Sequence, residues 1–264
     1  MKVGYIQTSP IFGEKNKNFE QVENLVSKLR ADLLVLPELF ATGYAFVSKE
    51  EVTSLAEEID GDTSDFLIDL SRKTNSIIVG GFIEKNESNI FNSAMIVSGS
   101  KRLGVYRKLH LYFKEKLWFA PGNRPPEIIK IKNIKIGIMI CFDWIFPEMA
   151  RSLALLGADI IAHPANLVLP YCQNAMITRC IENRIFVITS NRIGEENRGS
   201  DHFKFTGKSQ ITSFKGEILS SAPKDEIFID LVDIDIKEAR DKRINGFNDL
   251  FEDRRENLYF NIRR

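Results

Sequence analysis

The chain has 264 residues, a length that can bury a substantial core and is compatible with a single domain. Its 36 Lys and Arg residues equal its 36 Asp and Glu residues, so the charge balance does not point to nucleic acid or a membrane surface as a partner.

Two further features bound the environment in which the protein works. Residues 1–10 lack the cationic start, apolar centre and cleavage site of a signal peptide, and no segment reaches the roughly 18 uninterrupted apolar residues of a membrane span. The three cysteines, Cys141, Cys172 and Cys180, fit neither a disulfide framework nor a CxxC metal site. We therefore expect a cytoplasmic protein with reduced thiols.

The first half of the chain alternates short β-branched runs with stretches of helical periodicity. A strand is expected at residues 2–7, and apolar residues then recur at helical spacing over 19–29. The other elements expected here are a strand at 33–38, helices around 52–59 and 66–70, and successive strands at 77–84, 91–98 and 102–108.

The second half opens with IKIGIMIC at residues 134–141, which is apolar on both strand faces, as in a strand covered on both sides. Pro147 is suited to the first turn of a helix that stops at Gly157. The elements expected after it are a strand at 159–165, a helix around 176–181, a strand at 186–191, a hairpin-like pair around 215–216 and a strand at 226–232.

This order of elements indicates the fold. Strands that alternate with helices favour an α/β domain, whereas the consecutive strands near 77–108 and 205–233 imply antiparallel portions. We expect two mixed sheets with helices outside both, a four-layer α-β-β-α sandwich, in one domain over residues 1–264. Residues 243–264 are aromatic-rich without a clear period, and we expect a C-terminal tail that packs on its own domain or at a subunit interface.

Three reactive side chains end three of the predicted strands. Cys141 lies just before the helix expected at Pro147, at a sheet edge and near a positive helix end that favours thiolate. Glu38 ends an apolar run, where a buried carboxylate is suited to act as a general base. Lys108 ends a third run, where a neighbouring carboxylate keeps it charged. Singly, each has an ordinary alternative: a small buried thiol, an exposed loop acid or a solvated lysine.

The sequence blocks around these residues resemble the signature blocks of the nitrilase superfamily, the carbon–nitrogen hydrolases. They are LPELFATGY around Glu38, YRKLHLYFKEKLWFAPG around Lys108 and GIMICFDWIFPEMARSLALLGADIIAHPAN around Cys141, and the likeness runs through the terminal FEDRR. The resemblance implies a catalytic triad of these three residues, without metal or organic cofactor. Glu115 matches a second glutamate that orients the substrate amide or holds the lysine. We expect the backbone N–H of Phe142 to assist Lys108 at the oxyanion.

The walls of the substrate pocket are less constrained by the sequence. The candidates lie near Cys141 or follow the next two predicted strands: Phe113, Trp144, Phe146, Ala165, Asn166 and Asn191. The alternative for the aromatic residues is packing in a sheet or at an interface. We expect His163 to be a supporting or core histidine. Cys172 and Cys180 lie eight residues apart, with Met176 between them, which favours core packing on a helix.

The leading functional prediction is an amidase that converts a small aliphatic amide or carbamoyl compound to the acid and ammonia through a thioester. The alternative is a nitrilase for a small nitrile. Nitrile-specific members of the superfamily typically carry Cys-Trp-Glu, whereas this chain has Cys141-Phe142-Asp143, which favours amides. A second alternative is a catalytically silent ligand-binding or scaffold protein, against which the intact triad argues. The resemblance also implies a homodimer or larger even oligomer.

Overall fold

Two six-stranded sheets form the centre of the computed structural model, which describes residues 1–27 and 29–259. The strand order of the first sheet is β14-β1-β2-β3-β4-β5. Strands β1, β2 and β3 run parallel; β14 pairs antiparallel with β1, β4 with β3, and β5 with β4. In chain order these strands are β1 (Lys2–Gln7), β2 (Leu33–Val35), β3 (Ile77–Asn86), β4 (Asn89–Ser98), β5 (Lys101–Arg107) and β14 (Phe228–Asp233).

The second sheet has the same construction, in the order β13-β12-β9-β8-β7-β6. Its parallel centre is β7, β8 and β9, and antiparallel strands complete both sides. In chain order the strands are β6 (Ile128–Ile131), β7 (Ile134–Ile138), β8 (Ile160–Pro164), β9 (Phe186–Ser190), β12 (Gln210–Thr212) and β13 (Ile218–Ser221).

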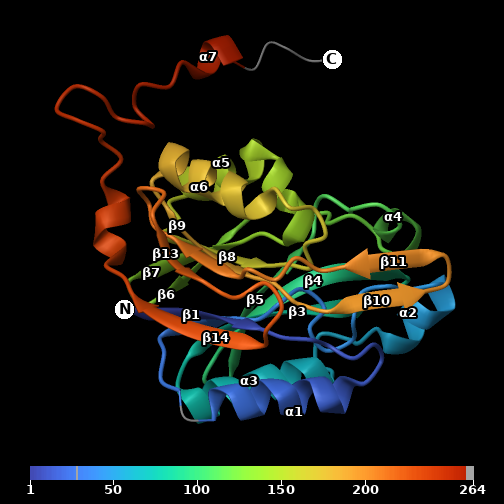
Figure 1. Cartoon of the computed structure of the whole chain (residues 1–264). Helices are drawn as coiled ribbons and strands as arrows, with labels where there is room; N and C mark the ends of the chain where they lie inside the picture. Colours follow the sequence, from blue (N-terminus) through green and yellow to red (C-terminus); the bar gives the residue numbers. More distant parts are fainter. Residues whose placement is uncertain (28, 260–264) are drawn as a thin grey trace.

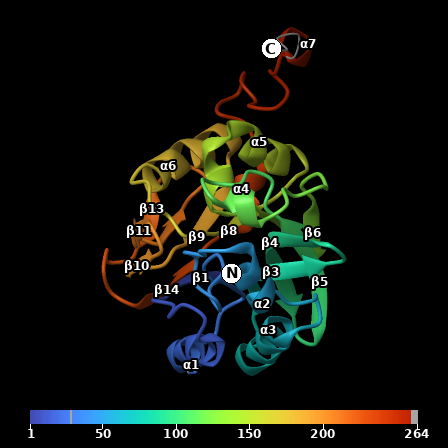
Figure 2. The same ribbon diagram turned by 90° about the vertical axis from the view of Figure 1, so that its right-hand side faces the viewer.

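Helices cover the outer face of each sheet. Helices α1 (Lys15–Val26) and α3 (Asp62–Thr74) lie against the first sheet, and α5 (Pro147–Leu155) and α6 (Cys172–Asn183) lie against the second (Figure 1; Figure 2). The predicted four-layer α-β-β-α sandwich with two mixed sheets is therefore confirmed.

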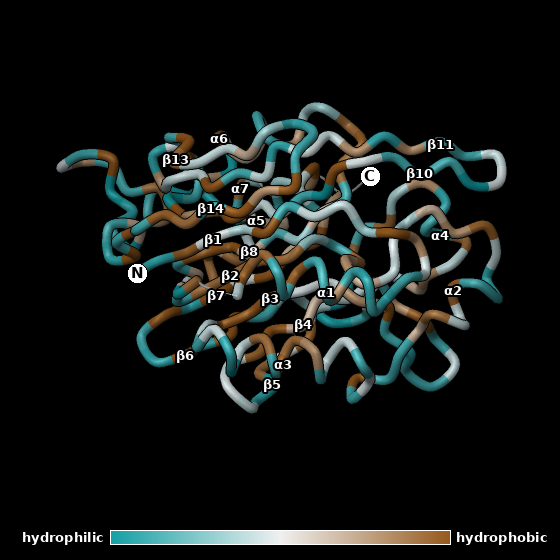
Figure 3. Tube along the Cα trace, turned by 60° about the horizontal axis from the view of Figure 1, so that its bottom comes forward, coloured by the Kyte–Doolittle hydropathy of each residue, from teal (hydrophilic) through white to brown (hydrophobic). Residues whose placement is uncertain are grey.

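The burial of the central strands explains why they form. Every residue of β2, β8 and β9 is buried, as expected for strands covered on both faces. Figure 3 shows the same division, with hydrophobic colour along the central strands and hydrophilic colour along the β10–β11 hairpin. The largest apolar cluster joins the facing surfaces of the two sheets to α5 and α6, and a second joins the first sheet to α1 and α3.

The remaining elements are short. They are α2 (Lys49–Leu55), α4 (Glu115–Trp118), the 3-10 turn η1 (Cys141–Ile145), the hairpin β10 (Glu195–Arg198) and β11 (Asp201–Lys204), the 3-10 turn η2 (Ile236–Arg240) and α7 (Glu256–Tyr259). Strand β6 and the β10–β11 hairpin were not predicted. The hairpin strands read EENR and DHFK, so they lack the apolar alternation that marks a half-buried strand.

Two predicted strands are shorter in the structure, and this matters for the site. The strand expected at 33–38 ends at Val35, and that expected at 134–141 ends at Ile138. Glu38 and Cys141 therefore lie beyond the last paired residues, in the turns that leave the sheets.

The C-terminal segment leaves the sandwich after η2. Phe251 still packs beside the main apolar cluster, with the Arg151 guanidinium 5.4 Å from its ring centroid. Figure 1 shows α7 away from the body, and Phe247 is 96% exposed. The part of the predicted tail from residue 260 onward lies outside the described residues. In the described ranges, no helix is both long enough and apolar enough to cross a membrane.

Candidate active site

The three reactive residues leave the same region of the sandwich from three different strands. Glu38 follows β2, Lys108 follows β5 directly, and Cys141 follows β7. The side chains of Glu38 and Lys108 are fully buried, and Cys141 is 5% exposed. Charged groups at that depth require partners, because burial without them is costly.

Lys108 binds two carboxylates at once. Its Nζ lies 2.7 Å from Glu38 Oε1 and 2.8 Å from Glu115 Oε1. Glu115 is held in turn by the Tyr112 backbone N–H, which donates to its Oε2 over 2.9 Å. An ammonium has three N–H donors, and these two contacts use two of them. The third N–H has no partner among the described residues.

The charges in this cluster depend on one another. Burial disfavours the ammonium of Lys108, but the carboxylates of Glu115 and Glu38 outweigh burial and raise its pKa. Burial raises the pKa of Glu115, an effect that Lys108 opposes and Glu38 reinforces. Tyr44 is buried beside Glu115, and burial together with the nearby carboxylates raises the pKa of its phenol well above 10.0. Lys108 therefore stays charged at any physiological pH.

The Cys141 thiol lies in surroundings that oppose its ionisation. Burial raises its pKa well above 9.0, and Glu38 adds to the effect; Lys108 and the backbone N–H of Asn166 oppose it. Cys141 opens a 3-10 turn and α5 begins only at Pro147, so the expectation that a helix start favours the thiolate stays a prediction. A thiol of this kind needs a base to become a nucleophile.

Behind Cys141, Asp143 ties the turn to the first sheet. Its Oδ2 accepts from the Ile140 N–H and the Tyr106 hydroxyl, both at 2.8 Å. Its Oδ1 accepts from the His110 backbone N–H at 3.1 Å and lies 2.7 Å from His110 Nδ1. Asp143 therefore holds the turn from behind, and its carboxylate is committed to these partners.

His163 supports Cys141 from the neighbouring strand β8. Its Nε2 lies 3.0 Å from the Cys141 carbonyl oxygen, and its Nδ1 lies 3.0 Å from Thr189 Oγ1. Burial lowers the pKa of His163 to about 4, so the ring is neutral and donates to the carbonyl. This supporting position is the one expected from the sequence.

The backbone around the cluster is strained at three residues. Leu39, Phe113 and Cys141 have φ values of 48°, 48° and 40°, in the left-handed region that non-glycine residues rarely adopt. Gly81 on β3 makes room for the turn at Glu38, since a Cβ there would lie 2.6 Å from the Leu39 nitrogen and 2.7 Å from the Glu38 Cα. Strain of this kind persists only where the surrounding structure enforces it.

The predicted pocket residues fall into two groups. Phe113 lines a small hollow beside the cluster, with Tyr44, Glu115 and Phe203 on its other walls. The side chain of Asn166 is 2% exposed, and its two amide atoms have no hydrogen-bond partner in the described part of the chain. Phe113 therefore borders the hollow, and Asn166 is buried with an amide that has no partner among the described residues.

The other predicted pocket residues have structural contacts. Trp144 and Ala165 are buried in the main apolar cluster, and Phe146 stacks on the His110 ring with centroids 3.7 Å apart. Asn191 Oδ1 accepts from the Leu167 N–H, and its Nδ2 donates to the Gly207 carbonyl and the Thr206 hydroxyl. The Asn191 amide supports the loop that carries Asn166, because its hydrogen bonds fix the residue next to it.

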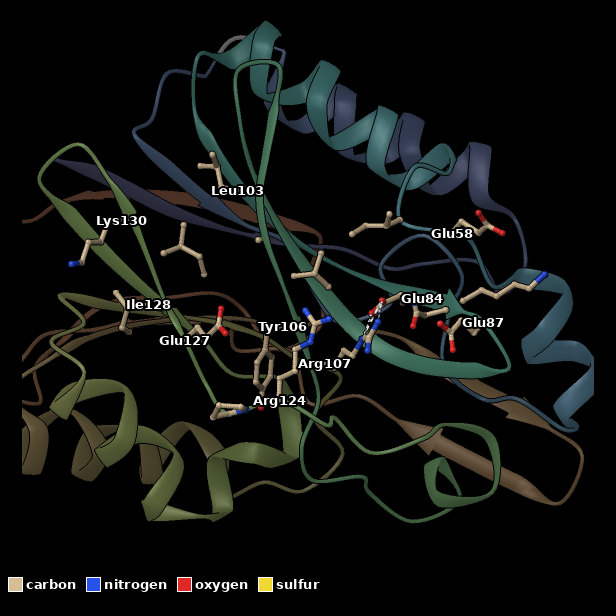
Figure 4. Close-up of a pocket in the computed structure, with 17 residues that line it drawn as sticks. Glu58, Glu84, Glu87, Leu103, Tyr106, Arg107, Arg124, Glu127, Ile128 and Lys130 are labelled. Atoms are coloured by element: carbon tan, nitrogen blue, oxygen red, sulfur yellow. Dashed lines mark hydrogen bonds and ion pairs between the residues drawn. The ribbon is translucent and has the colours of Figure 1, made fainter.

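A larger hollow lies elsewhere in the described part of the molecule. It measures about 720 Å³ and opens between the edge strands β5 and β6, with Glu84, Arg107 and Arg124 on its walls (Figure 4). Tyr106 also lines it, but Glu38, Lys108 and Cys141 do not. Over the described ranges, no group of three or more His, Cys, Asp or Glu side chains could hold a metal ion.

Comparisons with known proteins assign the chain to a family. The model of the carbon–nitrogen hydrolases matches residues 2–244. The chain belongs to the carbon–nitrogen hydrolase family. A protein of Pyrococcus abyssi named nitrilase is 48% identical, over 98% of this chain and 99% of its own length. An (R)-stereoselective amidase of a Pseudomonas species is 30% identical, over 97% and 92% of the two lengths.

Solved structures give the same answer. A carbon–nitrogen hydrolase from Helicobacter pylori G27 superposes with a TM-score of 0.89 at 27% identity, covering 98% of this chain and 96% of that one. The resemblance to the nitrilase superfamily is thereby confirmed, and the protein is a hydrolase of carbon–nitrogen bonds.

The sequence of this carbon–nitrogen hydrolase did not predict the contacts of two residues, Asp143 and Asn92. Asp143 was notable only as a difference from nitrile-specific members, although its position directly after Cys141-Phe142 was a signal that it acts on the turn. Asn92, whose Nδ2 donates to Glu38 Oε1 over 2.7 Å, lies within β4 among apolar residues. A polar amide inside a buried strand was the only signal, because its partner lies 54 positions away.

Proposed function

We propose that this protein is an amidase in which Cys141 is the nucleophile, Glu38 the general base and Lys108 the cation at the oxyanion. The observation that carries the proposal is the buried contact of Lys108 with Glu38 and Glu115, beside the buried thiol of Cys141. A thiol, a base and a fixed cation are the groups that acyl transfer through a covalent intermediate requires.

The reaction follows from these roles. Glu38 takes the thiol proton as the Cys141 sulfur attacks the carbonyl carbon of the amide. The oxyanion binds the free N–H of Lys108 and the backbone N–H of Phe142, which lies in the first turn of η1, where amides lack intrahelical acceptors. The proton passes to the leaving nitrogen, and ammonia departs. Glu38 then deprotonates a water that attacks the thioester, which releases the acid and restores the thiol.

Asn166 supports an amide as the substrate. A buried side-chain amide without partners is unfavourable, and a ligand that supplies both an acceptor and a donor relieves it. A carboxamide or carbamoyl group has both, whereas a nitrile has only an acceptor. The sequence difference at Asp143 gives less support for an amide substrate. The Asp143 carboxylate lies behind the turn, where it is hydrogen-bonded to Tyr106, His110 and Ile140.

A nitrile substrate is the second candidate, favoured by the 48% identity to the Pyrococcus abyssi protein named nitrilase. Attack of the same thiol on a nitrile carbon gives a thioimidate, which hydrolyses to the same acid. The experiment is to measure ammonia release from matched pairs of small amides and nitriles, with Cys141→Ala as the blank and Cys172→Ala as the control for loss of a buried thiol. Activity on nitriles alone would replace the amidase assignment, and activity surviving in Cys141→Ala would end both.

We also propose a homodimer or larger even oligomer in the cytoplasm, formed by one domain with residues 243–264 at the subunit interface. Exposed apolar side chains on the outer helices and the tail support the interface; they are Leu155, Leu156, Ile181, Ile244, Phe247 and Leu258. Three unpaired cysteines support a reducing compartment. Deletion of the residues after Phe247 should lower the mass measured by light scattering, and an unchanged mass would exclude the tail from the interface.

A further inference from the structure

Asn92 is fully buried in β4, and it contacts two of the proposed catalytic residues. Its side-chain Nδ2 donates to Glu38 Oε1 over 2.7 Å. Its backbone carbonyl accepts from the Lys108 backbone N–H over 2.9 Å. One residue therefore connects the base and the cation, although 54 and 16 positions of sequence separate it from them.

The hydrogen bonds of Glu38 are distributed unequally between its oxygens. Oε1 accepts from Asn92 Nδ2 and from Lys108 Nζ, both at 2.7 Å. Oε2 is buried and has no partner in the described ranges. Two donors on one oxygen fix the rotation of the carboxyl group, and the second oxygen keeps its lone pairs for an incoming proton.

We infer that Asn92 is a positioning residue that, together with Lys108, fixes Glu38 Oε1 so that Oε2 is the oxygen that takes the Cys141 proton and later activates water. This inference rests on the proposed function, because it assigns a role within that reaction. Asn92 acts through Glu38 and has no contact with the reacting atoms.

The remaining atom of the Asn92 amide supports this reading. Its Oδ1 is also buried without a partner in the described part of the chain. A buried acceptor that forms no hydrogen bond lowers stability, and an apolar side chain of the same shape avoids that loss. The amide is retained at this cost because its NH₂ group serves Glu38. An aspartate of equal size would instead place a like charge against the base.

Ser93 provides a matched control. It is the next residue of β4, is equally buried, and its hydroxyl donates over 2.6 Å to a different carboxylate, Glu84 Oε2. Consecutive residues of a strand point to opposite faces, so Ser93 serves a different cluster. Ser93→Ala and Asn92→Ala each remove one buried hydrogen bond to a glutamate, but only the second touches the proposed base.

The test is the pH dependence of kcat and KM for amide hydrolysis. In Asn92→Ala we expect kcat to fall roughly 10- to 100-fold with KM little changed, since losing a positioned proton acceptor affects the chemical step. The acidic limb of kcat/KM should move to higher pH, because a carboxylate that loses a donor holds its proton more strongly. Asn92→Asp, which preserves size, should move the limb further. Ser93→Ala should leave kcat and the limb unchanged.

A second readout does not depend on turnover. Alkylation of Cys141 by iodoacetamide, followed by mass spectrometry as a function of pH, should slow in Asn92→Ala and keep its wild-type profile in Ser93→Ala. Wild-type pH profiles in both Asn92 variants would overturn the inference while the wild-type enzyme remains an amidase. If the wild-type protein releases no ammonia from amides or nitriles, the proposed function fails instead, whatever Asn92 does. Because Asn92→Asp is isosteric, misfolding of Asn92→Ala does not remove the test.

Discussion

Two buried ion clusters lie on opposite faces of β4 and β5, and they differ in how completely their charges are satisfied. On one face, Arg107 pairs with Glu84 through Nε and Nη2, and the Ser93 hydroxyl adds a bond of 2.6 Å to Glu84 Oε2. On the other face, Lys108 pairs with Glu38 and Glu115, and Glu38 Oε2 is left without a partner in the described ranges.

The chemistry of the two cations follows this difference. The planar fork of Arg107 covers both oxygens of one carboxylate, which gives a closed and fully bonded pair. The ammonium of Lys108 is shared between two carboxylates that also face a thiol, so the cluster holds more negative groups than positive ones. Both oxygens of Glu84 are bonded, whereas Glu38 keeps one oxygen without a partner in the described ranges, which is the oxygen that we propose as the base.

The largest expected effect comes from replacing the Glu38 carboxylate with a group of equal size that is not a base. Glu38→Gln keeps the size of the side chain and an acceptor for Lys108, but it cannot take a proton. We expect kcat to fall about 10³-fold, within the range that general bases contribute, with thermal stability close to wild type. Steady-state ammonia release and a thermal melt measure the two quantities. A loss of less than tenfold would remove Glu38 from the role of base.

The same Glu-to-Gln substitution in the pair of Arg107 and Glu84 should instead lower stability and leave kcat unchanged. Glu84→Gln leaves Arg107, whose side chain is 11% exposed, without a charged partner. Breaking a buried pair from one side costs about 3–5 kcal/mol of unfolding free energy. The kcat of the folded enzyme should not change. Urea titration and active-site-normalised rates check this, and a large drop in kcat would show that the two clusters are not independent.

His163, which supports Cys141, should give the folded protein a pH-dependent stability. Its pKa is lowered by burial to about 4 from an unfolded value of 6.5. Below pH 6.5 the unfolded chain binds a proton that the folded chain refuses until about pH 4. The contribution of His163 to the free energy of unfolding is therefore fully present above pH 6.5. About 3 kcal/mol of it is lost as the pH falls to 4. In His163→Gln this part of the acid sensitivity should vanish in urea titrations at pH 7, 5.5 and 4.5.

Substitutions at two adjacent glycines of β3 distinguish a displacement of Glu38 from a general loss of packing. An Ala side chain at Gly81 meets the backbone of Glu38 and Leu39, whereas one at Gly80 meets only the side chains of Leu67 and Phe40. Both substitutions should lower the melting temperature, but only Gly81→Ala should lower kcat, by about tenfold or more, because the base shifts. Equal kcat values in the two variants would mean that the Glu38 turn tolerates displacement.

The smallest effect is expected at a half-exposed pair on the rim of the site. Lys114 Nζ lies 2.6 Å from Asp201 Oδ2 and links the segment before α4 to the β10–β11 hairpin. Exposed pairs contribute less than about 1 kcal/mol, and salt weakens them. Lys114→Ala should therefore change unfolding free energy by less than that, with kcat unchanged. A larger change in unfolding free energy would mean that this pair contributes as much to stability as the buried ion clusters do.

The sequence predicted the layers and the three reactive strand ends because both follow from local patterns. Apolar runs identify covered strands, and Glu38, Lys108 and Cys141 each follow such a run. The contacts of Asn92 and Asp143 depend instead on strand register and on how a turn folds back, which no local pattern contains. The same limit hid the raised pKa of the Cys141 thiol, since its burial by distant elements is the main cause. The polar β10–β11 hairpin was missed because tertiary contacts stabilise it, such as Glu196 with the Tyr44 and Ala45 amides.

The pairing of β1 with β14 constrains how the chain reaches this structure. Lys2 faces Asp233 and Gln7 faces Phe228, and the terminal amino group donates to the Ile234 carbonyl. A ribosome therefore releases β1 more than 200 residues before β14, its neighbour on one side, exists. Contacts of such long sequence separation slow folding, and an unpaired strand edge invites association with other chains in the interval. We expect truncation before Phe228 to yield aggregates, because β1 then remains an open edge.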